Sequence, residues 1–488
     1  MRAVGEETRT RAVDAPALRW LARFTVYAGW WGLLAYLLWT AFPTGDATPE
    51  HALSLLALAY LAAWGPFLIL ARWSPAGRLA RIAACSASIA AALALIELPS
   101  ALNLIDYRGV FHTPTPPWLR PGNAADPDLL FVREPNRRLR LAFQGADLHG
   151  LSGATPTRIH QCDTTLDADG FRNPPGLTEA RVVLVGDSFI EGLQVADDEL
   201  VSARLAELLG APVANLGRTG YGPQQELEVL RRHGLNYRPK TLVWAFYEGN
   251  DLQDLRSYES ERQRVLKSRF DSAYRLRYGR SFARNAGLWL LRWRNAEPAI
   301  PARLRAGIFN DSTDAEINIY FSCGVHEGGA EEALGRLESD EMDALREVFT
   351  KAHELCQERG VDLIVAFVPS KFRVLRDFCR FDADSPCPEW PIDELPKAVE
   401  NAARAASPEI GFLDLTDAMR SRAHAGELPY LVDDTHWSPE GHRTAAVALA
   451  EFIGRREASK HKATRPEKSQ VGERPRLAIG YEPVRASR

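Results

Sequence analysis

Two short polar blocks, far apart in the sequence, contain a serine and a histidine that could act together. Ser188 follows the apolar run 182–185 and a Gly-Asp pair, and His436 lies in the polar segment 432–442. A serine hydroxyl is a weak nucleophile until a neighbouring base takes its proton. A histidine can take that proton and return it to the leaving group. The two residues therefore predict acyl chemistry through a covalent intermediate on Ser188.

The histidine also needs a carboxylate, which fixes its tautomer and stabilises the imidazolium that forms. Asp433 and Asp434 both stand close to His436 in the sequence, and both are candidates. Each block also has a purely structural alternative. Ser188 has the form of a helix N-cap, and Ser438 with the proline after it has the form of a helix start, which would make the histidine incidental.

Two further blocks contain groups that could stabilise a negatively charged oxygen. Gly220 lies in the stretch 215–222, and Asn250 lies in the stretch 247–251. Glycine lets a backbone N–H approach a tetrahedral oxygen closely. An asparagine amide can donate to the same oxygen, and one such donor is worth ~3–4 kcal/mol. Each block alone is also typical of a turn, but four blocks at four strand ends favour a common site.

The elements around these blocks alternate between strands and helices. Short β-rich runs are expected to form strands over 181–185, 213–216, 241–247, 362–368 and 411–413. Helical patterns occupy 199–209, 224–233, 339–359, 395–406 and 439–453. Such alternation predicts a parallel sheet with helices on both faces. Ligands bind at the carboxyl ends of the strands in such sheets, which is where the four blocks lie.

The four blocks resemble those of the SGNH (GDSL-like) hydrolase superfamily. Its defining Ser, Gly, Asn and His would fall on Ser188, Gly220, Asn250 and His436. The resemblance covers roughly residues 165–455 and implies a flavodoxin-like three-layer α/β/α fold. It also implies ester chemistry without a metal or another cofactor. The implied oxyanion hole consists of the N–H groups of Ser188 and Gly220 and the amide of Asn250.

Part of the sequence is similar to one branch of that superfamily. Residues 434–437 and 369–374 resemble segments of bacterial alginate O-acetyltransferases, a likeness that favours Asp434. The usual spacing in the superfamily selects Asp433 instead, so both stay candidates. In the alginate enzymes the Asp-His pair precedes the serine, whereas here it follows the serine in the ordinary SGNH order.

Three apolar runs near the start predict a membrane anchor: 24–42, 52–71 and 82–98. Each is close to the ~20 residues that a helix needs to cross a bilayer. Five arginines precede the first run and three follow the second. The positive-inside rule then places the N-terminus in the cytoplasm and everything after the third run outside. The expected location is therefore a bacterial-type inner membrane, with several crossings and a periplasmic catalytic domain.

The chain is accordingly expected to have four parts. These are a three-helix transmembrane anchor (1–105), an extended Pro-rich linker (106–165), an SGNH hydrolase-like domain (166–455) and a disordered basic tail (456–488). Within the third part, residues 255–325 interrupt the rhythm of strands and helices. We interpret them as an insertion that caps the site, with a helix over 281–293.

Composition excludes some other functions. The net charge of −4 gives no basic surface for nucleic acid. The six cysteines include no Cys-x-x-Cys pair, so a structural zinc site is not expected. Cys379 and Cys387 flank a short loop and are either a disulfide, which an oxidising compartment would allow, or ordinary thiols.

The expected function is ester hydrolysis by a membrane-bound serine enzyme. Its partners would be the bilayer and an ester-bearing substrate, for which the resemblance and the location suggest O-acetylated surface polysaccharide. The first alternative is an O-acyltransferase that uses the same acyl-enzyme with a sugar hydroxyl in place of water. Three helices are few for an acyl-carrying membrane domain, so a transferase would need an envelope partner protein. The second alternative is an inactive binding module.

Overall fold

The computed structural model describes residues 75–113, 115–120, 122–144, 159–269, 279–295, 305–321 and 340–464. These residues divide into two compact units, which are described separately. The smaller unit includes residues up to 137, 168–170 and 256–302, and the larger one includes 138–167, 171–255 and the chain from 303 onward. Two of the three predicted membrane runs, 24–42 and 52–71, lie outside the described residues.

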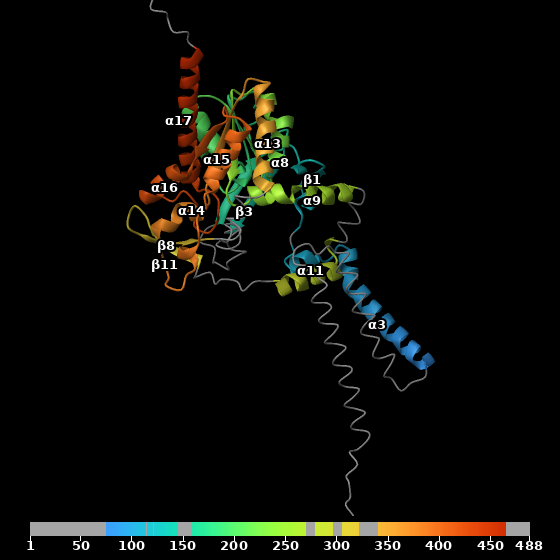
Figure 1. The fold of residues 1–488 in the computed structure, drawn as a ribbon. Helices are drawn as coiled ribbons and strands as arrows, with labels where there is room; N and C mark the ends of the chain where they lie inside the picture. The colour runs from blue at the N-terminus through green and yellow to red at the C-terminus, as the bar shows by residue number, and fades with distance from the viewer. Residues whose placement is uncertain are drawn as a thin grey trace, which may run out of the picture. The chain divides into compact units, whose positions relative to one another are not determined.

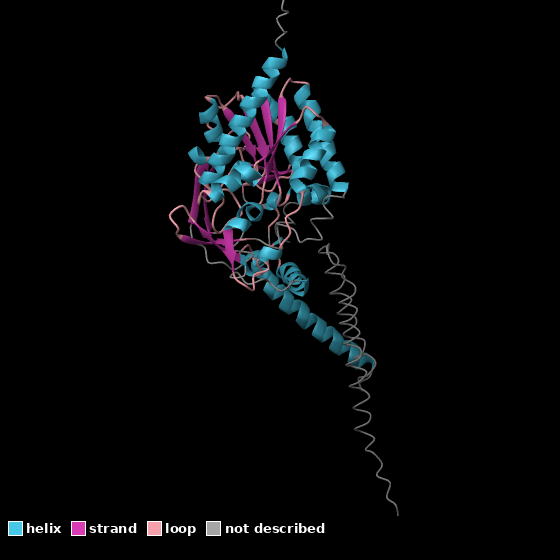
Figure 2. Ribbon diagram, turned by 60° about the vertical axis from the view of Figure 1, so that its left-hand side comes forward, coloured by secondary structure: helices cyan, strands magenta, loops and turns pink. Residues whose placement is uncertain are grey.

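The larger unit is built on a parallel sheet of five strands (Figures 1 and 2). The strands are β5 (Val182–Gly186), β6 (Val213–Gly217), β7 (Thr241–Tyr247), β10 (Asp362–Val368) and β12 (Gly411–Asp414). Their order in the sheet is β12-β10-β7-β5-β6, and every neighbouring pair is parallel. Numbered along the chain, this is the 2-1-3-4-5 order of flavodoxin-like folds. The predicted α/β class and parallel sheet are confirmed.

The strands are apolar because both faces of the sheet are covered. Every residue of β5, β6 and β7 is buried, and such strands have nearly continuous apolar sequences. Successive side chains point to opposite faces. Val243 packs in the core shared with α7 and α17, whereas the ring of Trp244 lies 5.8 Å from that of Phe349 on α13.

Helices form the two outer layers, as the sequence predicts. α7 (Val201–Leu209), α16 (Thr416–His424) and α17 (Pro439–Thr464) contribute to the core on one face. α8 (Pro223–Arg232), α13 (Asp340–Gln357) and α15 (Leu395–Ala406) pack together on the other. Figure 1 shows α17 and α13 on opposite sides of the strands. Two short helices, α6 (Ser188–Glu191) and α14 (Lys371–Leu375), directly follow β5 and β10.

The last helix is longer than the sequence indicated. Residues from 456 onward were expected to be disordered, yet α17 continues to Thr464. Two of its basic side chains reach the start of β10, where Arg456 and Lys460 lie 2.6 Å and 2.7 Å from the carboxylate of Asp362. These ion pairs fix the last turns of the helix to the sheet, and composition alone does not reveal them.

The segment predicted to be an extended linker, 106–165, contains strands that the sequence reading missed. β3 (Arg138–Gln144) pairs with β4 (Ile159–Thr165) in the larger unit, and β1 (Asn123–Asp126) pairs with β2 (Leu130–Arg133) in the smaller one. One face of the first ribbon buries Leu139 and Cys162 against other apolar side chains. The many prolines and arginines of this segment obscure the alternation of apolar and polar residues that would predict these strands.

A small antiparallel sheet completes the larger unit. It consists of β8 (Ala306–Asn310), β9 (Glu316–Tyr320) and β11 (Cys379–Phe381), in the order β11-β8-β9. Single 3-10 turns occupy Asp197–Glu199, Gly234–Tyr237, Arg376–Phe378 and Cys387–Glu389. Cys379 is a free thiol, so the disulfide considered between Cys379 and Cys387 is not formed. Burial raises the pKa of Cys379 to about 12, which keeps it protonated.

The smaller unit contains the third predicted membrane run. It comprises α3 (Pro75–Ala101), α4 (Tyr107–Val110), a 3-10 turn at Pro117–Leu119, the β1–β2 hairpin, most of α9 (Asp251–Arg269) and α11 (Phe282–Asn295). Among the described residues, α3 supplies the only segment long and apolar enough to cross a membrane, Ala83–Ala101. The predicted helix over 281–293 is confirmed as α11.

Candidate active site

The serine lies where the buried strand β5 turns into the short helix α6. Asp187, not Ser188, is the N-cap of that helix, because its carboxylate accepts the N–H of Phe189 at 2.9 Å. The close approach of β5 and α6 to β6 needs small residues. A Cβ on Gly217 would lie 2.3 Å from the backbone nitrogen of Glu191. The serine hydroxyl therefore serves no capping role and points to another partner.

That partner is His436, whose Nε2 atom lies 2.8 Å from the Oγ atom of Ser188. The histidine lies in the loop before α17, which closes on itself through two backbone hydrogen bonds. Leu431 donates its N–H to the carbonyl of His436 at 3.0 Å, and Ser438 donates to Pro429 at 3.0 Å. The imidazole also packs on the ring of Phe189, with 5.1 Å between the ring centres. Its position is thus set by both its loop and α6.

Asp434 holds the other side of the imidazole. Its Oδ1 atom lies 2.5 Å from Nδ1 of His436 and accepts the backbone N–H of His436 at 2.9 Å. Burial opposes ionisation of this carboxyl, but His436 and Lys371 together hold its pKa below the ordinary value. Asp433 is buried as well. Of the two candidate aspartates, the geometry brings Asp434 to the ring.

A buried lysine that the sequence reading did not assign supports the same loop. Lys371 begins α14, after the carboxyl end of β10, and is fully buried. Its ammonium donates to the backbone carbonyls of Val432 and Asp434 at 2.9 Å and 3.2 Å. The only sequence signal for a role of Lys371 was its place inside the segment 369–374, which resembles the alginate O-acetyltransferases. Lys371 therefore fastens the segment that carries Asp434 to the end of the sheet.

A second buried network connects the loop of Asn250 to the same segment. The carboxylate of Glu248 accepts the backbone N–H of Ser370 and the Nε–H of Arg373, both at 2.7 Å. Arg373 also lies 2.7 Å from Asp393. Burial disfavours the charge on Arg373, but the two carboxylates raise its pKa overall. The ends of β7 and β10 are thereby joined by charged groups of opposite sign.

The two remaining candidate residues follow β6 and β7, the strands on either side of β5. Gly220 has a φ of +81°, a conformation that side chains with a Cβ rarely adopt. The amide of Asn250 donates to Oδ2 of Asp254, one turn along α9, at 2.5 Å. The sheet order thus places Ser188, Gly220 and Asn250 at the ends of three adjacent strands.

A buried ion pair, also missed from the sequence, shapes the loop that contains Gly220. Glu191 of α6 and Arg218 after β6 are almost fully buried, and Oε1 of the former lies 3.0 Å from Nη1 of the latter. The other carboxylate oxygen accepts the backbone N–H of Thr219 at 2.9 Å and its hydroxyl at 2.6 Å. Glu191 thus ties the two residues before Gly220 to the helix that begins with Ser188.

Three buried carboxyls lie around the start of α6 and α9: Asp187, Glu226 and Asp251. Burial raises the pKa of Glu226 well above its usual value, and Asp187 and Asp254 raise it further. Burial also raises the pKa of Asp251, with Glu226 and Asp187 adding to the effect. Within the described ranges, no group of three or more His, Cys, Asp or Glu side chains is arranged to hold a metal ion.

A second histidine of the same sequence block has a different environment. His442 is buried in α17, and its Nδ1 atom accepts the N–H of Val201 at 3.2 Å. Burial lowers the pKa of His442 to about 3, with smaller contributions from Arg172 and His436. His442 is therefore a neutral structural acceptor, whereas the partly exposed His436 contacts the serine.

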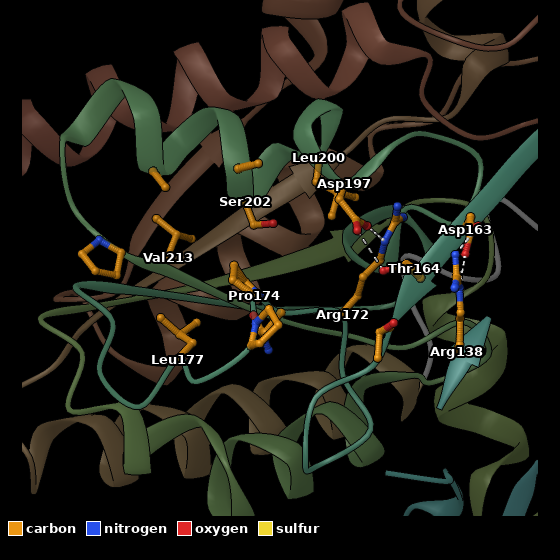
Figure 3. Close-up of a pocket in the computed structure, with 16 residues that line it drawn as sticks. Arg138, Asp163, Thr164, Arg172, Pro174, Leu177, Asp197, Leu200, Ser202 and Val213 are labelled. Atoms are coloured by element: carbon orange, nitrogen blue, oxygen red, sulfur yellow. Dashed lines mark hydrogen bonds and ion pairs between the residues drawn. The ribbon is translucent and has the colours of Figure 1, made fainter. Parts of the chain in front are cut away.

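A cavity of about 550 Å³ lies in the same unit (Figure 3). Arg172 forms part of its wall and donates to the carbonyls of Gly192 and Val195 and to Asp197. Arg138 and Asp163 pair at the rim, with 2.7 Å between Nε and Oδ1. None of its described lining residues is Ser188, His436 or Asp434. The cavity is separate from the serine, and Arg172 connects it to the end of α6.

The fold and the site define a class of protein: a flavodoxin-like α/β domain with a Ser-His-Asp arrangement at the carboxyl edge of its sheet. A family model described as "SGNH hydrolase-like domain, acetyltransferase AlgX" matches residues 330–478. That range includes Asp434 and His436 but not Ser188. The predicted resemblance to the SGNH superfamily, with similarity to alginate O-acetyltransferase-like proteins, is confirmed.

A curated relative and two solved structures are among the similar proteins. "Probable alginate O-acetylase AlgJ" of Pseudomonas putida is 33% identical over 99 residues, which are 20% of this chain and 24% of the relative. The chain thus matches about a quarter of that protein. A variant of Axe2, an acetyl-xylooligosaccharide esterase from Geobacillus, is 13% identical, with 57% of this chain and 95% of that one covered and a TM-score of 0.30. A lipase/acylhydrolase from Enterococcus faecalis is 16% identical, with 56% and 95% covered and a TM-score of 0.28.

Proposed function

We propose that this chain is a serine enzyme that cleaves acyl esters through an acyl-enzyme on Ser188. The observation that carries the proposal is the unbroken contact from Ser188 Oγ to His436 Nε2, 2.8 Å, and from His436 Nδ1 to Asp434, 2.5 Å. Ser188 and His436 are both partly exposed, so an ester can reach them. The buried Asp434 keeps its charge because its pKa lies below the usual value.

The proposed reaction uses the serine, the histidine and the aspartate in turn. Ser188 Oγ attacks the ester carbonyl while His436 takes the hydroxyl proton, and Asp434 stabilises the imidazolium. The N–H groups of Ser188 and Gly220 and the amide of Asn250 stabilise the tetrahedral oxyanion. His436 then protonates the departing alcohol, which leaves the acyl group on the serine. Water, activated by His436, attacks this ester, which releases the acyl group as a carboxylic acid and restores the Ser188 hydroxyl.

Acyl transfer is the second candidate, and the comparisons favour it specifically. The matching family model is described as an acetyltransferase, and the curated relative is named as an alginate O-acetylase. Transfer needs the same acyl-enzyme, with a sugar hydroxyl in place of water as the attacking group. In either direction, we propose O-acetylated polysaccharide outside the cytoplasmic membrane as the substrate class. The apolar helix α3 supports a membrane location. We further propose that the apolar runs 24–42 and 52–71 also cross the membrane.

Labelling and product analysis together test the proposal. One sample of the full chain in detergent is treated with a fluorophosphonate probe. A separate, unlabelled sample receives a p-nitrophenyl acetate donor in the presence or absence of an oligosaccharide acceptor. We expect wild type to be labelled and Ser188→Ala not to be. Acetate release without acceptor indicates hydrolysis, and acetylated oligosaccharide indicates transfer. Equal labelling of the two proteins would refute the nucleophile and favour a binding module.

A further inference from the structure

The insertion between β7 and β8 contains a helix whose surroundings point to a lipid surface. We infer that α11 lies at the membrane–water interface and is a second membrane contact beside α3. The inference concerns the smaller unit alone and does not depend on the catalytic proposal. Three observations support it. These are the hydrogen bonds between α3 and α11, the aromatic rings that pack around α11, and the large apolar side chains that stay exposed.

The first observation is that the end of the apolar helix holds the start of α11. Glu97 lies in the last turns of α3, and its carboxylate accepts the hydroxyl of Ser281 at 2.7 Å. It also accepts the N–H groups of Phe282 and Ala283 at 3.0 Å and 2.7 Å. A carboxylate in a membrane helix is costly unless it has such partners. The structure therefore keeps the N-terminus of α11 level with the end of α3.

The second observation is a packed set of rings that orients α11. The ring of Phe282 lies 5.3 Å from that of Tyr107 and 5.5 Å from that of Phe111, both in edge-on contact. The Tyr107 hydroxyl donates to the carbonyl of Ile96 on α3 at 2.8 Å. The buried Asn285 donates to the carbonyl of Gly279 at 2.8 Å and contacts Thr113. These contacts leave α11 one face that no described part of the unit covers.

The third observation is the apolar character of what remains exposed. We define the juxtamembrane patch as Leu102, Leu104, Ile105, Val110, Trp289 and Leu290, all large apolar side chains that are exposed. Leu104 is 74% exposed and Trp289 is 48% exposed. The patch begins at the residue after the apolar segment Ala83–Ala101. Its members on α11 belong to a helix that packs against α3 and α4. The patch is thus an extension of the surface that α3 presents to the hydrocarbon.

Lipid is the occupant that these observations favour. Tryptophan is enriched at the membrane–water interface, where its ring is apolar and its N–H stays wet. Helices that lie in the interface bury their apolar side ~5–10 Å into the headgroup region. Asp106, beside the patch, forms ion pairs with two basic side chains and lies 2.6 Å from Arg108 and 3.6 Å from Arg280. These ion pairs lower the cost of holding the charged groups close to lipid.

Site-directed fluorescence can test the depth of α11. The full chain is reconstituted in nanodiscs with Cys85→Ala and Cys323→Ala, and Leu290→Cys is labelled with an NBD dye. Cys379 is protected because its pKa is raised to about 12. The matched control is Leu208→Cys on α7 of the larger unit, where the leucine is 52% exposed against 54% at Leu290. Leu104→Cys provides a second position in the patch. Circular dichroism and thermal melting verify that each variant folds.

We expect labels at positions 290 and 104 to emit at shorter wavelength and to lose roughly half of their fluorescence when the acyl chains are brominated. The label at position 208 should respond to neither. Water-like emission without quenching at both patch positions would overturn the inference. A blue shift that brominated lipid does not quench would also overturn it, because it would show that protein covers the patch.

Discussion

The Oγ atom of Ser188 lies 2.8 Å from the Nε2 atom of His436, although 248 positions of sequence separate them. The strand order explains this contact. Ser188 follows β5 and His436 precedes α17, which packs on α7 beside that strand. The order reverses between β5 and β7, and such a switch point is where flavodoxin-like sheets bind their ligands. The topology therefore brings the two side chains together at the edge of the sheet where chemistry is expected.

Asp434→Asn should lower kcat by about 10³–10⁴-fold, because the amide cannot stabilise the imidazolium or keep the correct tautomer. Asp433→Asn is the matched control, since both residues are buried and adjacent. We expect the control to retain most of its kcat, measured with p-nitrophenyl acetate and compared with the melting temperature. A larger loss in Asp433→Asn would reassign the orienting carboxylate.

Lys371→Met should loosen the loop before α17 without touching the substrate. The variant leaves the carbonyls of Val432 and Asp434 without their ammonium donor, a loss expected to cost about 1–3 kcal/mol of stability. We expect kcat to fall more than KM rises, because His436 is displaced. Lys351→Met, which breaks an exposed pair on α13, controls for loss of a lysine. If kcat and stability both match those of the control, Lys371 does not position the loop.

Glu191→Gln should disrupt the loop that carries Gly220. Removing the charge leaves Arg218 buried without its counter-ion, which typically costs about 3–5 kcal/mol. Asp197→Asn is a useful comparison, because its pairing partner Arg172 is equally buried while Asp197 itself is 58% exposed. We expect urea unfolding to show a much smaller loss for that variant. Burst kinetics would further show slower acylation in Glu191→Gln, and equal stability losses would contradict this account.

The sequence predicts the sheet and the reactive blocks well because both depend on local patterns. The predicted strands over 241–247 and 362–368 coincide with β7 and β10, since an apolar run between turns already defines a buried strand. The partners of buried charges cannot be found in this way. Lys371 and Arg218 have charged side chains that look exposed in the sequence, and only the fold shows what they meet. The same holds for the choice between Asp433 and Asp434.

Glu226→Gln should change how stability depends on pH. Burial raises the pKa of Glu226 in the folded state, so the folded chain binds more protons than the unfolded chain above the ordinary value of 4.5. Wild type therefore loses stability as the pH rises from 4.5 through the raised pKa. The variant lacks this contribution, and its stability relative to wild type should increase with pH. Urea unfolding between pH 4 and 8 measures the difference, and a constant difference would show that Glu226 titrates normally.

His442→Asn should change the pH dependence of stability with the opposite sign. The pKa of His442 falls from 6.5 to about 3 on folding, so the unfolded chain binds a proton that the folded chain excludes. Its contribution to stability is complete above pH 6.5 and declines as the pH falls towards 3. At pH 5 the loss is about 2 kcal/mol, at 1.36 kcal/mol per pH unit. Asparagine keeps an acceptor for the N–H of Val201 but does not titrate.

The variant should be less stable than wild type at pH 8, because it loses the edge-on contact with Trp437. That deficit should narrow by about 2 kcal/mol at pH 5, where wild type has lost the contribution of its neutral imidazole. Arg443→Gln, at a partly exposed neighbouring position of α17, controls for general effects of acid on the helix. Parallel stability curves for wild type and His442→Asn would mean that the imidazole is accessible to protons in the folded chain. His442 could not then be the neutral acceptor that holds α17 to the start of α7.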